Sequence, residues 1–194
     1  MHNCDHGGVG SDLAATYIVE ACSAGHFGAG LFKSQLHTAY HAFCGFMRTS
    51  GLAAEYGLPK KCTPGRLNRD REKDYPSLST RFKAMHVKCV CVWVANVCLD
   101  HVNTPYERLV ATCCLSFGRW FQLFDNAAIL LTDGEVTEAQ RLGKRYLASY
   151  QTLANMAIDR GRALYNIRPN IHAVDHMIRN LTKKEKPTVL QLLC

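Results

Sequence analysis

The sequence predicts an all-α fold, a single helical domain of about five to seven helices, on three observations. Apolar residues in segment 135–167 recur every three or four positions. Four aromatic residues in segment 117–124 repeat with the same period. A helical spacing also continues through segment 78–99, and no second apolar run of comparable quality could pair with it in a sheet. A strand would alternate with a period of two instead.

The N-terminal residues 1–10 are polar and rich in glycine, and we expect them to be mobile. The domain is predicted to cover residues 11–181, followed by a charged and then apolar tail at 182–194. Its first helix begins at Ser11 or Asp12, because either side chain can accept a hydrogen bond from the amides of a first helical turn.

Three glycines after Cys22 separate this helix from a second one, which is predicted from about Leu31 to Met47. The same stretch has the outline of a phosphate-binding loop, but two residues separate Gly30 from Lys33. In that loop the lysine directly follows the last glycine, because its ammonium group must reach the phosphates. We therefore interpret the glycines as a turn between two helices.

Segment 51–76 is predicted to be an exposed basic loop. Prolines at 59, 64 and 76 interrupt it, and its run 60–73 holds six basic and two acidic residues. Such a run is either solvated surface or an arm that contacts nucleic-acid phosphates, and both interpretations stay open. The candidate phosphate-binding residues, here and in the basic segment 179–186, are Lys60, Lys61, Arg66, Arg69, Arg71, Lys183, Lys184 and Lys186.

Segment 87–97 is ambiguous by composition, because its valines and its tryptophan favour a strand. The helical spacing from Leu78 to Leu99 instead indicates a central helix that is apolar on nearly all sides, and we prefer this interpretation. The apolar run 89–99 is shorter than the about 20 residues that a membrane-spanning helix needs.

The next two helices are predicted to form an antiparallel hairpin. The second spans Glu135 to Ile167, because Thr132 and Glu135 have the spacing of a capping box and Pro169 disfavours helix at the residue before it. A short helix from Pro169 to Leu181 follows. The first helix of the hairpin begins after a proline and carries one aromatic face, which we interpret as core shared with Trp93: Phe117, Trp120, Phe121 and Phe124.

Composition indicates the compartment and the charge of a partner. The chain has 23 Lys and Arg against 16 Asp and Glu, a net charge of +7 that mildly favours an acidic partner. Its ten cysteines include no Cys-x-x-Cys pair, so we expect free thiols in a reducing, intracellular compartment, cytoplasmic or nuclear. We expect no secretory signal and no membrane association. The apolar end at 189–194 has no evident partner and indicates a piece of a longer chain.

Catalytic motifs are missing from the sequence, which has no nucleophile elbow, Walker motif, zinc ribbon or HExxH. We therefore expect no cofactor, and the sequence favours a protein that is not an enzyme. Asp100, Asp125 and Asp175 stand singly, and we interpret them as helix caps or as surface partners of basic residues.

Two histidine pairs repeat one pattern: His37 with His41, and His172 with His176, each spaced i, i+4 on a predicted helix. This spacing lets two imidazoles converge on one metal ion. Neither pair encloses the glutamate of a metalloprotease, and we expect that the pairs do not meet in one four-histidine site. The alternative is that these histidines pack at helix ends or face water.

The stretch YNIRPNIHAVDH at 165–176 places a basic residue and a proline before a helix with two histidines. Over Leu164 to Leu181 it resembles an element of mobile-element-derived, transposon-like open reading frames of protists and plants. It departs from that pattern at Asn170, where a lysine would be usual, and no integrase-type carboxylate triad can be placed on the chain. The resemblance implies a helical region of a larger element protein and confers no activity.

The sequence thus predicts a non-catalytic helical interaction module with an unidentified protein partner. The alternative is a nucleic-acid-binding domain that acts through the basic segments 60–73 and 179–186. Catalysis is a third hypothesis, which a concave pocket that collects a titratable pair would favour.

Overall fold

Helices account for all the regular structure of the described chain. The structure, a computed structural model, describes residues 8–69, 71, 74–79, 81–128 and 130–181, and these contain no strand. The all-α prediction is therefore confirmed. In chain order the elements are α1 (Val9–Ser23), α2 (Phe32–Thr49), α3 (Leu52–Tyr56), the 3-10 turn η1 (Pro64–Leu67), α4 (Ala84–Val97), the 3-10 turn η2 (Cys98–Asp100), α5 (Pro105–Asn126), α6 (Asp133–Asp159) and α7 (Pro169–Asn180).

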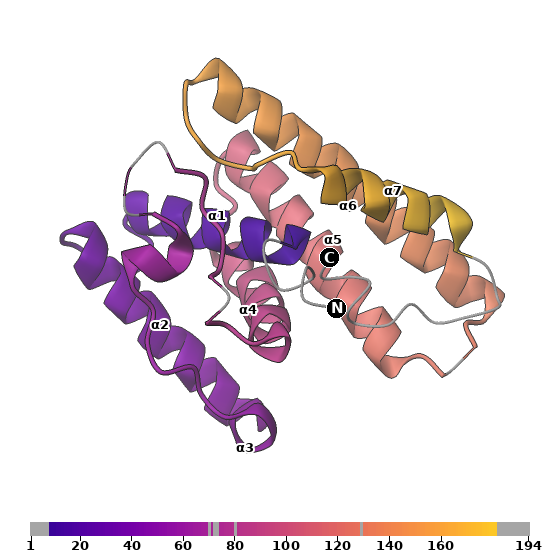
Figure 1. Cartoon of the computed structure of the whole chain (residues 1–194), viewed down its shortest axis with the longest axis horizontal. Coiled ribbons are helices and arrows are strands. Elements are labelled where there is room, and N and C mark those ends of the chain that lie inside the picture. The colour runs from indigo at the N-terminus through magenta and orange to yellow at the C-terminus, as the bar shows by residue number, and fades with distance from the viewer. Residues whose placement is uncertain (1–7, 70, 72–73, 80, 129, 182–194) are drawn as a thin grey trace.

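The two longest helices, α5 and α6, form the predicted antiparallel hairpin, and α7 lies along α6 (Figure 1). The helices α1 and α4 pack on each other and on α5, while α2 and α3 lie beyond them, away from α6. The predicted capping box of α6 is present, because the Glu135 amide donates to Thr132 Oγ1 at 3.2 Å and the Thr132 amide donates to the Glu135 carboxylate at 2.7 Å. Thr104 and Glu107 form the same box at α5.

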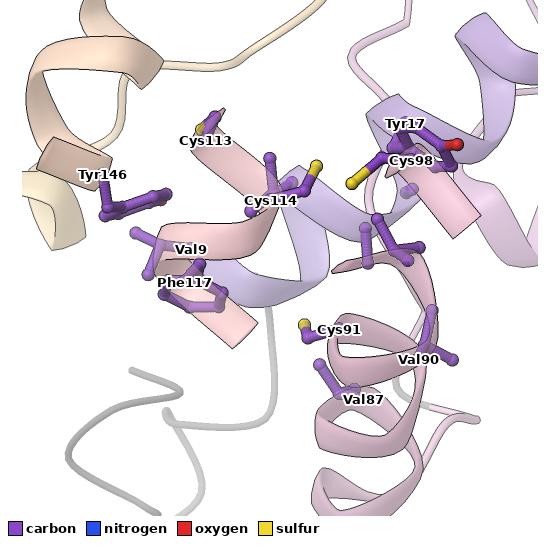
Figure 2. Packing of buried hydrophobic residues seen from close by; sticks show 14 of the residues in the cluster. Val9, Tyr17, Val87, Val90, Cys91, Cys98, Cys113, Cys114, Phe117 and Tyr146 are labelled. Atoms are coloured by element: carbon purple, nitrogen blue, oxygen red, sulfur yellow. The ribbon is translucent and has the colours of Figure 1, made fainter. Parts of the chain in front are cut away.

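The core is one continuous cluster that includes Trp93, Trp120 and the predicted aromatic face of α5. Figure 2 shows Phe117 of α5 beside Val9 of α1, and the Phe117 ring centroid lies 4.6 Å from that of Tyr146 on α6. The valine-rich segment 87–97 is a helix, as preferred, because α4 packs against α1, α2, α3 and α5 and can bury apolar side chains on nearly all sides. All eight cysteines in the described residues are free thiols.

The prediction that the long helix continues to Ile167 is wrong. Helix α6 ends at Asp159, because Gly161 adopts a left-handed conformation with φ of 64°. The Gly161 amide donates to the Ile158 carbonyl and the Arg162 amide to the Ala157 carbonyl, both at 2.9 Å. The residues from 160 to 168 therefore turn back, which brings them over the end of α1.

Other boundaries also differ from the sequence expectations. Helix α1 begins at Val9, inside the segment 1–10 expected to be mobile, because Val9 and Gly10 are buried and the Cys91 thiol donates to the Gly10 carbonyl. Helix α4 begins only at Ala84. The segment 51–76 holds α3 and η1, and its Leu67 is fully buried. The expectations for residues 1–7 and for the tail 182–194 lie outside the described residues.

None of the helices in the described part of the chain is long and apolar enough to cross a membrane.

Candidate functional site

A pocket of about 310 Å³ opens beside the C-terminal end of α1. This volume is at the lower end of the roughly 300–1,000 Å³ found for small-molecule sites. The pocket is lined by α1, the turn after it, the segment from η2 into α5, and the turn after α6. The lining residues are Tyr17, Glu20, Ala21, Ser23, Ala24, His26, Cys98, His101, Thr104, Tyr106, Glu107, Val110 and Arg162.

One carboxylate, that of Glu20, joins three of these segments. The Tyr106 hydroxyl donates to Glu20 Oε1 at 2.6 Å, and the Tyr165 hydroxyl donates to Glu20 Oε2. The Arg162 Nη1 atom lies 3.4 Å from Glu20 Oε1. Burial and the neighbouring Glu20 carboxylate raise the pKa of both tyrosines, so their hydroxyls keep the protons that they donate. The Glu20 side chain is only 12% exposed, and these donors replace the water that a buried carboxylate loses.

Tyr165 reaches Glu20 from an uncommon backbone conformation, with φ of 53°. A left-handed conformation costs a residue with a Cβ atom about 1–2 kcal/mol. Tyr165 is fully buried, and its ring packs edge to face on Tyr150 with ring centroids 5.6 Å apart. Burial of the ring and the hydrogen bond to Glu20 offset the backbone cost.

Two stacked histidines form another side of the pocket. The rings of His26 and His101 are nearly parallel, with centroids 3.7 Å apart. His26 Nε2 lies 3.9 Å from Glu107 Oε1. Burial, and then the neighbouring His101, lower the pKa of His26, while Glu107 opposes this shift, so the neutral imidazole is favoured. The Glu107 carboxylate also holds the N-terminal cap of α5.

Two buried polar atoms at this pocket lack a hydrogen-bond partner among the described residues, the Tyr17 hydroxyl and His26 Nδ1. Tyr17 is only 3% exposed, and Figure 2 shows it beside Cys98, another lining residue. Buried polar groups are nearly always paired, and an ordered water or a bound molecule would each satisfy these two atoms. Eight further buried polar atoms of the described residues also lack a hydrogen-bond partner, so the two do not by themselves mark a binding site. The pocket thus combines an apolar floor with carboxylates and unpaired polar atoms at its walls.

Sequence reasoning missed this pocket. One signal was present, because Glu20 is the only charged residue in the second half of α1, most of which is buried. A charged residue on such a helix needs buried partners. Its partners Tyr106, Arg162 and Tyr165 are between 86 and 145 positions away in sequence, so no local pattern reveals them.

The structure separates the predicted nucleic-acid residues into two kinds. Lys60, Lys61 and Arg71 are exposed. Arg66 donates to the Lys61 carbonyl at 2.7 Å, and Arg69 donates to the Asp74 carbonyl at 2.8 Å, so both guanidinium groups hold the shape of the loop. The candidates Lys183, Lys184 and Lys186 lie outside the described residues.

The two histidine pairs lie on different helices. His37 and His41 are exposed on α2, and His172 and His176 are exposed on α7. Helix α2 packs on α1, α3 and α4, whereas α7 packs on α6. Within the described residues no group of three or more His, Cys, Asp or Glu side chains is placed to hold a metal ion.

The described part of the chain is thus a set of packed helices with a pocket beside α1 whose walls carry polar groups. Neither the family models, nor the curated proteins, nor the solved structures with which the chain was compared match it. The resemblance of Leu164 to Leu181 to transposon-like reading frames stays a prediction.

Proposed function

We propose that the chain is a non-catalytic helical interaction module that binds a partner protein by taking one of its lysine or arginine side chains into the pocket beside α1. One observation carries this proposal. The lining holds two carboxylates, Glu20 and Glu107, against the single guanidinium of Arg162, although the chain as a whole is basic. A cationic group is the best match to that local charge.

The contact that Arg162 makes with Glu20 leaves room for a competing cation. Its length of 3.4 Å exceeds the about 2.7–2.9 Å of a charge-assisted hydrogen bond, and the Arg162 side chain is 41% exposed. The ring of Tyr106 already has a cation over it, because the Arg160 guanidinium lies 4.9 Å from its centroid. The carboxylate oxygens are therefore the groups that an incoming ammonium or guanidinium group would contact.

The reactive groups on the lining support binding over catalysis. The Ser23 hydroxyl donates to the Val19 carbonyl at 2.8 Å, and the Cys98 thiol donates to the Ala95 carbonyl at 3.2 Å. The Tyr106 hydroxyl donates to Glu20. The pocket does collect His26 and Glu107, the kind of titratable pair that favours an enzyme. The candidate nucleophiles beside this pair, Ser23, Cys98 and Tyr106, already donate their hydrogens to other groups.

The test is a titration of the protein with the capped tripeptide Gly-Lys-Gly, followed by nuclear magnetic resonance. A tripeptide with norleucine in place of lysine has the same apolar stem without the charge. We expect shifts of the resonances of Glu20 and Tyr106 with the lysine peptide, and much weaker binding of the norleucine peptide. Removing one carboxylate charge near the ligand should weaken lysine binding about fivefold, since an exposed contact of this kind is worth roughly 1 kcal/mol.

The matched variants are Glu107→Gln and Glu135→Gln. Glutamine can replace glutamate in a capping box, so both variants keep their helix caps, but only Glu107 lines the pocket. Weaker binding should appear in Glu107→Gln alone. Equal binding of the lysine and norleucine peptides, or an equal loss in both variants, would refute the proposal.

Nucleic-acid binding is the second candidate, supported by the exposure of Lys60, Lys61 and Arg71. The test replaces these three residues with glutamine and leaves Arg66 and Arg69 in place, because those two stabilise the loop. Retention on single-stranded or duplex DNA should then fall, and the salt dependence of log Kd should flatten by nearly one for each lost phosphate contact. Absence of retention by the unchanged protein at low salt would exclude this candidate.

A further inference from the structure

The two exposed histidine pairs have the same geometry, and neither pair belongs to the pocket or to the basic segment. His37 Nε2 and His41 Nε2 are 3.1 Å apart, and their ring centroids are 4.3 Å apart. His172 Nε2 and His176 Nε2 are 3.0 Å apart, with centroids at 4.4 Å. In both pairs the same ring nitrogens face each other across one helical turn.

These separations match those of two ligands on one metal ion. Imidazole nitrogens bind Zn²⁺ at about 2.0–2.1 Å, so nitrogens about 3 Å apart would subtend roughly 95° at the ion. That angle lies between the values for octahedral and tetrahedral coordination. Both rings of a pair must be neutral with their hydrogen on Nδ1, so that both Nε2 lone pairs are free for the ion.

We propose that each pair chelates one transition-metal ion of the class that imidazole prefers, such as Ni²⁺, Cu²⁺ or Zn²⁺. Without metal, the two Nε2 atoms of each pair, at 3.1 and 3.0 Å, share one hydrogen in an N–H···N hydrogen bond, so binding moves that hydrogen to Nδ1 and needs no change of the backbone. In the described part of the chain no third His, Cys, Asp or Glu completes either site, so water fills the remaining positions. The two sites are independent, because α2 and α7 pack on different helices and lie apart in Figure 1.

The experiment is calorimetric titration of the untagged full chain with NiCl₂. His41→Ala and His176→Ala should each remove one bound ion, and the double variant should remove two. The differences between variants isolate the helical pairs, because residues 1–7 are unchanged throughout. Each variant replaces an exposed side chain, and circular dichroism at 222 nm confirms that it is folded.

A register control separates chelation from the number of surface histidines. The variant His41→Ala with Ala42→His keeps two exposed histidines on α2, but at i, i+5 they point in different directions around the helix. It should lose the same ion as His41→Ala. Nickel should also raise the thermal midpoint of the unchanged chain more than that of the double variant, since ligand binding to the folded state stabilises it.

Two results would overturn the proposal. One is an unchanged number of bound ions in His41→Ala and His176→Ala. The other is full nickel binding by the register control, which would show that single histidines suffice.

Discussion

The buried carboxylate of Asp12 should make the stability of this protein fall as the pH rises. Asp12 is only 1% exposed at the start of α1, and its Oδ2 atom lies 3.0 Å from Arg168 Nε. Burial raises its pKa from 3.8 to about 6, while a hydrogen bond with Ser77 and the charge of Arg168 lower it. The effect of burial on this pKa is the largest, because the ion pair with Arg168 does not fully replace the hydration that the carboxylate loses.

The direction of the effect follows from the two pKa values. The folded-state pKa of about 6 is above the value of 3.8 expected for the unfolded chain, so the folded state binds the proton more tightly. The contribution of Asp12 to stability is therefore fully present below pH 3.8 and is lost as the pH rises through about 6. Between pH 4 and pH 7.5 the loss amounts to about 2–3 kcal/mol.

The variant Asp12→Asn isolates this contribution, because asparagine imitates the protonated acid and does not titrate. The free energy of unfolding is measured with urea at several pH values between 4 and 7.5 for both proteins. The difference, variant minus unchanged protein, should increase by about 2–3 kcal/mol over this range. In Arg168→Gln the loss of stability should move to higher pH, because the Arg168 charge lowers the pKa of Asp12. A difference that is flat, or that decreases with pH, would refute this reasoning and mean that Arg168 holds Asp12 charged.

Three further predictions concern packing and the Glu20 junction, which is the Glu20 carboxylate with its partners Tyr106, Arg162 and Tyr165. A Cβ atom on Gly118 would lie 2.5 Å from Ala95 Cβ, which cannot rotate away, so Gly118→Ala should lower the free energy of unfolding by about 1–3 kcal/mol. Gly134→Ala meets nothing closer than 4.0 Å in the first turn of α6 and should raise it by about 0.4–1 kcal/mol; urea unfolding measures both. Tyr165→Phe removes a donor from the buried Glu20 carboxylate and should cost about 1.5–3 kcal/mol in the same assay, and a neutral result would contradict that hydrogen bond.

A helix could be predicted from the sequence wherever apolar residues recur at helical spacing. This was true even where the individual residues favour a strand. The valines of α4 favour a strand, but the helical spacing of that segment and the lack of a pairing strand correctly indicate a helix. The end of α6 was predicted wrongly, because Leu164 and Ile167 prolong the apolar pattern past Gly161. Gly161 was the position at which the helix ends, but Gly143 lies inside the same helix, so a glycine alone does not show where a helix stops; the left-handed φ of Gly161 is known only from the structure.

The candidate site could not be predicted in the same way, because its geometry is entirely long-range. Glu20 contributes one carboxylate, and its donors come from α5 and from the turn after α6. That turn reaches α1 only because α6 ends eight residues earlier than its pattern suggests, which places Arg162 and Tyr165 outside the helix. The misplaced helix end and the missed pocket therefore have one cause.

The Glu20 junction also links occupation of the pocket to folding. Its hydrogen bonds join residues 86 and 145 positions apart, so the unfolded chain does not present the pocket, and a ligand there binds only the folded state. Such a ligand at one hundred times its Kd would stabilise the fold by about 2.7 kcal/mol. This stabilisation is as large as the whole change in the free energy of unfolding expected from the titration of Asp12. It is also similar to the loss of stability expected in Tyr165→Phe. A partner side chain in the pocket would therefore hold α1, α5 and the turn after α6 together through the same carboxylate that recognises it.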